Sequence, residues 1–461
     1  MTIRVKTLAP LHIGCGESYS GLNYILDKNL LYYIEPDKMF AFLKEQKKIE
    51  EYVQWIETES DKIANIEQNR PARDADKEEK KEFNKRLNSV KNAFILKQFS
   101  QKNRITLDSF KKMECYHLIL RDRIYDSAEV QRFIHQQNHP YLPGTEIKGA
   151  IRTAILFDAI EKDHRNYEWL KKEIIRFGDD FKNEISRVEN QKKPDKRTKE
   201  FLNKRMADIS EALQERILNS SAHRKDAKYD ILKYLFISDS NLVQAQDKLE
   251  IAHVEPFNTR FSKTFQEYVK PHETFEFKDL KVNQYPLMKE KLGFTEQQNK
   301  YVSKIEEIAR CCHDFSEALL NHEIEFFKKC KKDDIVNQLN IISRENTIEN
   351  PVLRIGKDEG YLSLTMGLVV KKNDCELYEN VLIHATKGTS YDSRSGGLLP
   401  KTRKIVYYDG KEYTSGWIKL LLNDRADVTQ KPAKAKDIKT TSTQPTTESL
   451  KSLQNKFGGR K

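Results

Sequence analysis

Apolar and polar residues alternate over much of the first 35 positions, which is the pattern of half-buried strands. The alternation runs through residues 3–8, and residues 23–27 and 30–34 form two further strands that a Lys-Asn turn joins. Residues 37–57 place apolar side chains three and four positions apart instead, which predicts a helix. A group of strands followed by a helix indicates the start of an α+β unit.

Strand patterns return after this helix and are followed by a long amphipathic segment. The further predicted strands are residues 115–121, 232–238, 249–254 and 274–277. Residues 296–331 repeat apolar positions at three and four, which predicts one long helix whose apolar face belongs to the core. Short strands separated by glycines follow Pro351 and end at residues 416–422.

The repeated order of strands, helix and strands predicts an α+β fold made of two ferredoxin-like (RRM-type) domains. We expect the first domain at residues 1–255 and the second at 256–422. Two highly charged helical stretches, near 58–112 and 162–226, are interpreted as insertions into the first domain. Residues 423–461 carry few large apolar side chains, which predicts a disordered basic tail.

Charge favours a polyanionic partner without demonstrating one. The 461 residues include 81 Lys plus Arg and 70 Asp plus Glu, a formal net charge of +11. This excess suits nucleic acid, but solvated helices carry similar charge. Residues 192–205 hold seven basic side chains against two acidic ones, and fit either a solvated or mobile segment or an RNA-contacting arm.

Cysteine spacing and hydropathy indicate neither a metal site nor a membrane segment. The six cysteines form no C-x-x-C pair, so the sequence signals neither zinc nor a disulfide framework. The chain has no signal-peptide pattern at its start and no run of about 18 apolar residues. We therefore expect a soluble, cytoplasmic protein.

The clearest local motif is PYLPGTEIKGAIRTA at residues 140–154. Its Pro-Gly turn precedes a helix that Thr145 can cap, with Glu146 in the first turn where the helix dipole favours a carboxylate. Lys148 and Arg152 are four positions apart, so they share a face above the helix start, and Gly149 indicates close approach of a backbone or ligand. The motif predicts a phosphate contact, with ordinary surface cations around a packing glycine as the alternative.

The segment PLHIGCG at residues 10–16 ends the first strand with Gly14 and Gly16, which permit a tight loop. It is no dinucleotide fingerprint, because the third glycine of G-x-G-x-x-G would fall on Tyr19. His12 fits either a general base for RNA cleavage or a strand-end residue.

The C-terminal third interleaves glycines with cations. RIGKDEG at residues 354–360 supplies Arg354, Gly356 and Lys357, and PKTRK supplies Lys401 and Arg403. Such loops bring backbone amides and positive charge to a sugar-phosphate chain without reading bases. The sequence contains no Walker A motif, metal-binding helix motif or nucleophile elbow.

Taken in order, LHIGCGE, YLPGTEIKGAIRTAIL, FISDSNL, RIGKDEGYLSL, PKTRK and SGWIKL resemble the type III-A CRISPR RAMP proteins that form the fifth subunit of Csm effector complexes. The resemblance spans residues 3 to about 422, apart from the two charged stretches. The turn followed by K-G-x-I-R is shared with RAMP proteins more widely, and the terminal motifs are similar to this subfamily in particular.

The resemblance implies two RRM-like RAMP domains and a non-catalytic subunit that binds guide RNA (crRNA) toward its 3′ end, with no cofactor and no metal. The implied partners are a backbone RAMP subunit, other Csm subunits and host nucleases that trim the guide. The RNA-facing elements would be residues 12–16, 148–152, 354–360 and 401–403. The implied roles are capping of the backbone filament, support of crRNA maturation and antiviral defence.

Two other function classes remain open. A metal-independent RAMP endoribonuclease that processes guide RNA would need a histidine at a scissile phosphate. A free-standing RNA-binding protein would bind RNA tightly without other subunits.

Overall fold

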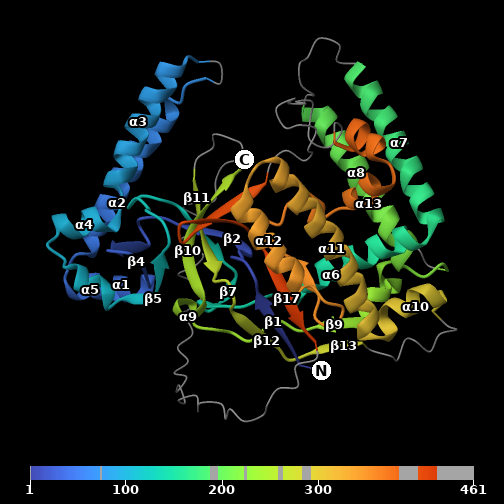
Figure 1. Ribbon diagram of the computed structural model, residues 1–461. Coiled ribbons are helices and arrows are strands. Elements are labelled where there is room, and N and C mark those ends of the chain that lie inside the picture. Colours follow the sequence, from blue (N-terminus) through green and yellow to red (C-terminus); the bar gives the residue numbers. More distant parts are fainter. Residues whose placement is uncertain are drawn as a thin grey trace. The chain divides into compact units, whose positions relative to one another are not determined.

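The computed structural model describes residues 2–72, 75–186, 196–222, 226–257, 263–282, 292–383 and 403–422. The predicted tail, Lys401 and residues 192–195 of the basic segment 192–205 lie outside the described residues, whereas residues 196–205 begin helix α8 (Lys196–Leu218). In the described part, helices and strands mix as expected for an α+β fold (Figure 1). No helix among the described residues is long and apolar enough to cross a bilayer.

The strands form two larger sheets. The order in the nine-stranded sheet is β2-β6-β11-β10-β5-β4-β3, with β15 pairing with β10 and β16 with β15. The four-stranded sheet has the order β12-β1-β17-β14. The strand bounds are β1 Ile3–Thr7, β2 Gly14–Tyr19, β3 Tyr24–Asp27, β4 Leu30–Ile34, β5 Glu114–Leu120, β6 Val130–Phe133, β10 Leu249–Pro256, β11 Thr264–Val269, β12 Thr274–Phe277, β14 Val352–Arg354, β15 Lys404–Tyr408, β16 Lys411–Thr414 and β17 Trp417–Leu421. Two short pairs are β7 His135–Gln136 with β8 His139–Pro140, and β9 Leu235–Ile237 with β13 Leu280–Val282.

Both larger sheets join segments from the two ends of the chain. In the four-stranded sheet β1 pairs with β12 on one side and with β17 on the other. The boundary predicted at residues 255–256 falls at the end of β10, which pairs with β11 beyond that boundary. Strands from both sides of the predicted boundary therefore share each sheet, and the N-terminal segment lies beside the C-terminal one.

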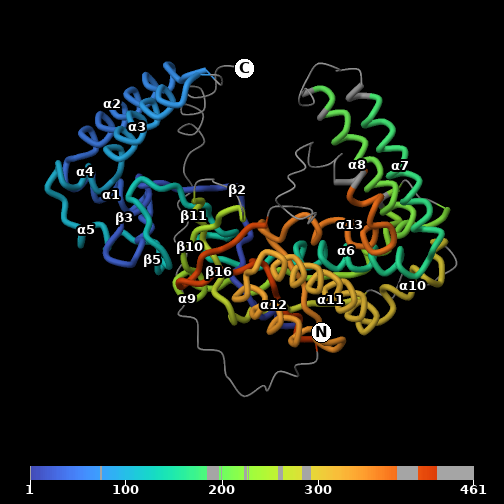
Figure 2. Tube along the Cα trace, turned by 45° about the horizontal axis from the view of Figure 1, so that its top comes forward, coloured from blue at the N-terminus to red at the C-terminus, as the bar shows by residue number. Residues whose placement is uncertain are grey.

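Helices cover the sheets and form most of the two highly charged stretches. The α2–α3 pair and the α7–α8 pair extend at different places from the sheets (Figure 2). Figure 1 shows α11 beside α6, the helix of the PYLPGTEIKGAIRTA motif. The helix bounds are α1 Pro36–Glu45, α2 Ile49–Gln68, α3 Lys77–Ala93, α4 Leu96–Lys102, α5 Leu107–Lys111, α6 Gly144–Lys162, α7 His164–Ser186, α8 Lys196–Leu218, α9 Ala245–Lys248, α10 Glu296–Ser303, α11 Ile305–Lys329, α12 Asp333–Glu345, α13 Gly367–Asn373 and α14 Cys375–Leu377.

Backbone breaks correct two predicted helices. The helix predicted at 37–57 is interrupted between α1 and α2, where Lys47 has a φ of 55°. The helix predicted at 296–331 is interrupted at Lys304, whose φ of −140° and ψ of 134° are extended. The strand predicted at 232–238 is a 3-10 turn followed by the short β9. Each predicted helix is therefore two consecutive helices, α1 and α2 in the first case and α10 and α11 in the second.

Candidate nucleic-acid interface

Helix α6 begins against a distant segment of the chain. Asp239, in the FISDSNL motif, accepts a hydrogen bond at 2.8 Å from the N–H of Gly144. Gly144 lies so close to Ser238 that a Cβ there would be 2.4 Å from the Ser238 carbonyl oxygen. The predicted cap by Thr145 is wrong, because the helix begins one residue earlier, after Pro143, where no N-cap side chain is bonded. A tertiary contact thus supplies the acceptor that a local cap would supply.

Two glycine loops and the C-terminal motif meet at the end of the first strand. The N–H of Lys357 donates to the carbonyl of His12 at 3.0 Å. Gly356 has a φ of +90°, and a Cβ there would lie 2.5 Å from the same carbonyl. Gly416 has a φ of +89° and donates its N–H to the carbonyl of Pro10 at 2.9 Å. We call residues 10–16, 354–360 and 415–416 the glycine seam.

The start of α6 also belongs to this neighbourhood. Glu146 accepts a hydrogen bond from the backbone N–H of Gly356, although burial raises the pKa of the Glu146 carboxyl. Burial raises the pKa of Glu359 to about 8, with Arg354 acting against the rise and Glu146 adding to it. Motifs separated by more than 200 residues therefore meet at one place, which sequence order alone does not indicate.

His12 is fixed inside the seam rather than exposed on it. Its side chain is 2 % exposed, and its Nδ1 lies 2.7 Å from the carbonyl oxygen of Glu267. Because a carbonyl only accepts, Nδ1 carries the proton and the buried Nε2 is left without a hydrogen-bond partner. Burial lowers the pKa of His12 to about 4, partly offset by this bond and reinforced by Lys357. The ring is neutral and shielded, which suits packing better than acid/base chemistry.

The predicted cations of α6 contact protein atoms. Lys148 donates to the carbonyl of Leu235 at 2.9 Å, and burial lowers the pKa of its ammonium group. Arg152 forms an ion pair with Asp230 at 2.6 Å. Gly149 is exposed, and a Cβ there would meet nothing within 4 Å. Gly149 therefore has open space beside it, whereas Lys148 and Arg152 are both bound to protein groups.

Arg354 and Arg403 are buried around one carboxylate. Arg403 donates to Glu323 at 2.8 and 3.0 Å, and Arg354 contacts the same carboxylate at 3.4 Å. Arg354 also stacks over Trp417, with its guanidinium carbon 5.1 Å from the ring centroid. All three charged side chains are at most 5 % exposed. These two arginines support the seam from inside, where RNA cannot reach them without rearrangement.

The exposed residues of the seam are three of its glycines, Gly14, Gly16 and Gly360, and one lysine, Lys357, whereas Gly356 and Gly416 are buried. A Cβ at Gly14 would lie 3.9 Å from the Lys357 side chain. The ammonium group of Lys357 donates to Gln131 on β6 at 2.6 Å. The sequence did not single out Gln131, because β6 is too short for its alternation to be read.

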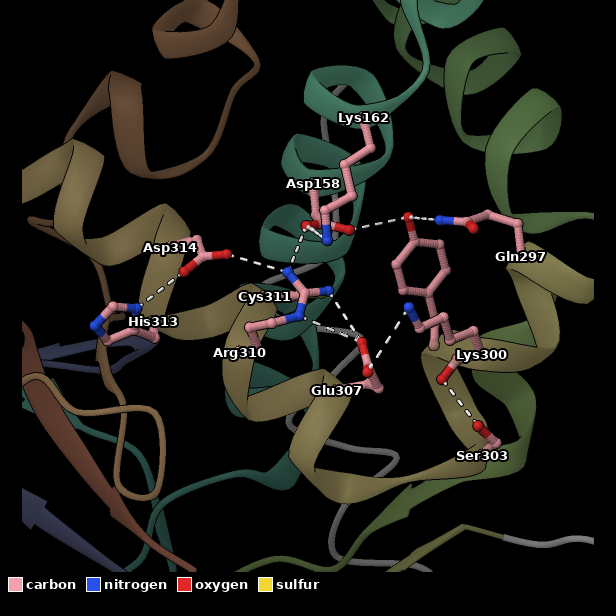
Figure 3. Close-up of polar contacts among 11 residues, drawn as sticks. Asp158, Lys162, Gln297, Lys300, Ser303, Glu307, Arg310, Cys311, His313 and Asp314 are labelled. Atoms are coloured by element: carbon pink, nitrogen blue, oxygen red, sulfur yellow. Dashed lines mark hydrogen bonds and ion pairs between the residues drawn. The ribbon is translucent and has the colours of Figure 1, made fainter.

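A charged cleft of about 750 Å³ lies between α6, α11 and α13. Figure 3 shows Asp158 of α6 reaching Lys162 and Arg310, each at 2.9 Å, and Asp314 bridging Arg310 to His313. Arg310 and Lys162 lower the pKa of Asp158, although burial acts in the opposite direction. The charges compensate one another, so this network fastens α6 to α11 rather than forming an anion site.

Comparisons with known proteins agree with this architecture. The RAMP superfamily model matches residues 4–423. A protein of Methanocaldococcus jannaschii named CRISPR system Cms protein Csm5 is 24 % identical, with 92 % of this chain and 89 % of the relative aligned. A Csm5 of Streptococcus thermophilus is 29 % identical over 160 residues, 33 % of this chain and 37 % of the relative.

Two solved structures share the fold. A chain from a cryo-EM structure titled as a Csm-crRNA-target RNA ternary complex of a type III-A CRISPR-Cas system aligns with a TM-score of 0.61 at 18 % identity, covering 91 % of this chain and all of that one. The crystal structure of T. onnurineus Csm5 aligns with a TM-score of 0.56 at 18 % identity, covering 90 % and 99 %. The family model spans nearly all of the described chain, and the relatives are Csm5 proteins of CRISPR systems. The chain therefore belongs to the RAMP superfamily.

Proposed function

We propose that the chain is a non-catalytic, guide-RNA-binding subunit of a type III-A CRISPR effector complex. Family membership and the similarity to Csm5 proteins support a place in that complex. Its partners would be crRNA, a backbone RAMP subunit, other Csm subunits and host nucleases that trim the guide. The protein would act in the cytoplasm, in maturation of crRNA and in defence against foreign nucleic acid.

The glycine seam is the observation that carries the proposal. Exposed backbone at Gly14 and Gly16 lies beside Lys357, and Gly149 leaves open space on the helix whose start joins the seam. Backbone N–H groups and one cation can hold a sugar-phosphate chain without reading its bases. A guide RNA requires this kind of binding, because its sequence differs from one guide to the next.

The expected RNA contacts divide into two groups. We propose direct contacts for Gly14, Gly16, Gly149 and Lys357. We assign Arg354 and Arg403 to support of these loops. Lys148 and Arg152 would contact phosphate only by exchanging their present protein partners, the Leu235 carbonyl and Asp230.

Lys357→Ala in the reconstituted complex tests the seam. Removing one phosphate contact to single-stranded RNA should reduce the slope of log K against log salt by about 0.7, so we expect a reduction near that value. Lys81→Ala is the matched control, because Lys81 is 76 % exposed on α3 and pairs with Glu78 at 3.7 Å. An unchanged slope for a folded Lys357→Ala complex would contradict the assignment.

We further propose that the fold comprises two ferredoxin-like halves and that the chain caps the 3′-side end of the backbone filament. The two halves differ, because the α6 motif and both charged insertions precede residue 256. A subunit with unlike ends terminates a repeating head-to-tail assembly. Native mass spectrometry should find one copy per complex, and gene deletion should leave guides with heterogeneous 3′ ends; several copies per complex would refute capping.

The alternative, a metal-independent RAMP endoribonuclease, receives no support from His12. Its Nε2 is shielded, and its pKa of about 4 leaves the ring neutral at physiological pH. We expect no cleavage of guide precursor or target RNA by the isolated chain in EDTA or with Mg²⁺. Cleavage that His12→Ala abolishes would establish the enzyme instead.

A further inference from the structure

Three metal-binding side chains gather on the edge strand that carries the glycine loop. Cys15 and Glu17 lie on β2, and His135 begins β7 shortly after β6, the strand that pairs with β2. The thiol sulfur, a carboxylate oxygen and an imidazole nitrogen all lie within 4.8 Å of one another. The histidine is 118 to 120 positions from the other two in sequence, so ligand spacing could not reveal the group.

The backbone of β2 brings the two nearby ligands together. The register of β2 against β6 shifts between Gly14 and Ser18, which marks a bulge or irregularity. Gly16 lies between the two ligands with a φ of +83°, a conformation that glycine adopts without strain. Bulges redirect side chains at sheet edges, and this one accompanies the approach of the Cys15 sulfur to the Glu17 carboxylate.

The hydrogen bonds around the histidine leave a lone pair for a metal. His135 Nδ1 lies 3.0 Å from the carbonyl oxygen of Phe133, which requires the proton on Nδ1. In the neutral ring the lone pair is then on Nε2, which faces Glu17 with 3.8 Å between Nε2 and Oε2. A backbone carbonyl on the other ring nitrogen is the usual arrangement of metal-ligating histidines.

Arg132 contacts two of the three side chains, and its carbonyl oxygen accepts a hydrogen bond at 3.7 Å from the Cys15 thiol, a bond that ends when the thiol loses its proton to bind a metal. Arg132 contacts the Glu17 carboxylate at 3.5 Å, while its guanidinium group stacks over Tyr33 with 4.8 Å to the ring centroid. In an occupied site this contact would orient the carboxylate from outside, as partners of ligating carboxylates do. The Glu17 side chain is 62 % exposed, which leaves access for a water as a fourth ligand.

We propose that Cys15, Glu17 and His135 form a three-ligand site for Zn²⁺ that fastens β2 to the β6–β7 segment. A thiolate with an imidazole and a carboxylate suits zinc and disfavours Mg²⁺ or Ca²⁺. Binding releases the thiol proton to solvent and involves no redox change. The site goes beyond the RNA-binding function and revises the expectation that the chain holds no metal.

The test is titration of the reduced, metal-free full chain with Co²⁺, followed by displacement with Zn²⁺. We expect one equivalent of cobalt with a thiolate-to-cobalt charge-transfer band and the visible bands of tetrahedral cobalt, all lost on adding zinc. Cys15→Ser should abolish the charge-transfer band, and His135→Gln should weaken zinc binding by at least about 10-fold.

Two matched variants control for the residue types. Cys375→Ser changes the exposed cysteine at the start of α14, and His139→Gln changes a nearby histidine whose Nδ1 also contacts a backbone carbonyl, that of Gln137, at 2.9 Å. Both should bind cobalt as the wild type does. A wild-type protein without the charge-transfer band, or a band that survives Cys15→Ser, would overturn the site.

Discussion

Replacing Glu323 with glutamine tests how the arginines beneath the seam are held. Glu323, on α11, is 1 % exposed and lies between Arg403, just before β15, and Arg354, at the end of β14. Burial opposes its ionisation, but Arg403 and then Arg354 outweigh this effect and lower the pKa of Glu323. Glu323→Gln preserves the shape and leaves two buried guanidinium groups without this counter-charge.

We expect this substitution to destabilise the folded state by about 3–5 kcal/mol, the range for breaking a buried ion pair by removing one partner. The loss of stability should depend on pH. A lowered folded-state pKa means that the wild-type contribution is complete above the ordinary carboxyl pKa and is lost as pH falls through the folded value. The difference between wild type and Glu323→Gln should therefore shrink in acid.

Urea unfolding at pH 7.5 and at acid pH, followed by tryptophan fluorescence, measures this difference. Trp417 is buried beside Arg354, so its emission reports this region. Glu325→Gln is the matched control, because Glu325 forms an exposed pair with Lys329 at 2.6 Å and should change stability by less than about 0.5 kcal/mol. A decrease in stability below about 1 kcal/mol for Glu323→Gln, with an unchanged m-value, would refute the reasoning.

Three further substitutions test single features of the seam and of the helix start. Burial raises the pKa of Glu359 to about 8, and Glu146 adds to the rise. The folded state therefore keeps a proton that the unfolded chain releases near 4.5, so the free energy of unfolding falls as pH rises between these two values. Glu359→Gln should remove that fall and stabilise the protein by up to about 3 kcal/mol at pH 7. Urea unfolding from pH 5 to 8 measures the free energy of unfolding against pH, and an equal pH dependence for variant and wild type would contradict this. Gly416→Ala should destabilise by roughly 1–3 kcal/mol in the same assay, because its Cβ would lie 2.2 Å from a carbonyl oxygen at positive φ, whereas Gly410→Ala, also at positive φ but in open space, should cost less. Asp239→Ala should cost about 0.5–2 kcal/mol by leaving the first N–H of α6 without its acceptor, and equal melting of variant and wild type would show that water replaces it.

The sequence determined the elements whose signals are local. Alternation at residues 3–8, 23–27 and 30–34 predicted β1, β3 and β4, and the pattern at 115–121 and 249–254 predicted β5 and β10. In β1 burial alternates along the strand, whereas the first six residues of β10 are all buried, so a period of two marks the one and a largely apolar run marks the other in the sequence. Short strands such as β2 and β6 were missed, because four to six residues with glycine or charged side chains carry little periodicity.

Only the tertiary structure decided which motifs meet and which side chains remain at the surface. The sequence marked Gly14 and Gly356, and the SGWIKL motif that contains Gly416, but pairing of strands far apart in the described chain brings the loops around these glycines into contact. It also marked Arg354 and Arg403 as cations for RNA, although both are buried against Glu323, which carries no motif of its own. The sequence does not show which residue pairs with a given charged side chain, because that residue lies on another element. Whether the pair is buried depends on how the two elements pack.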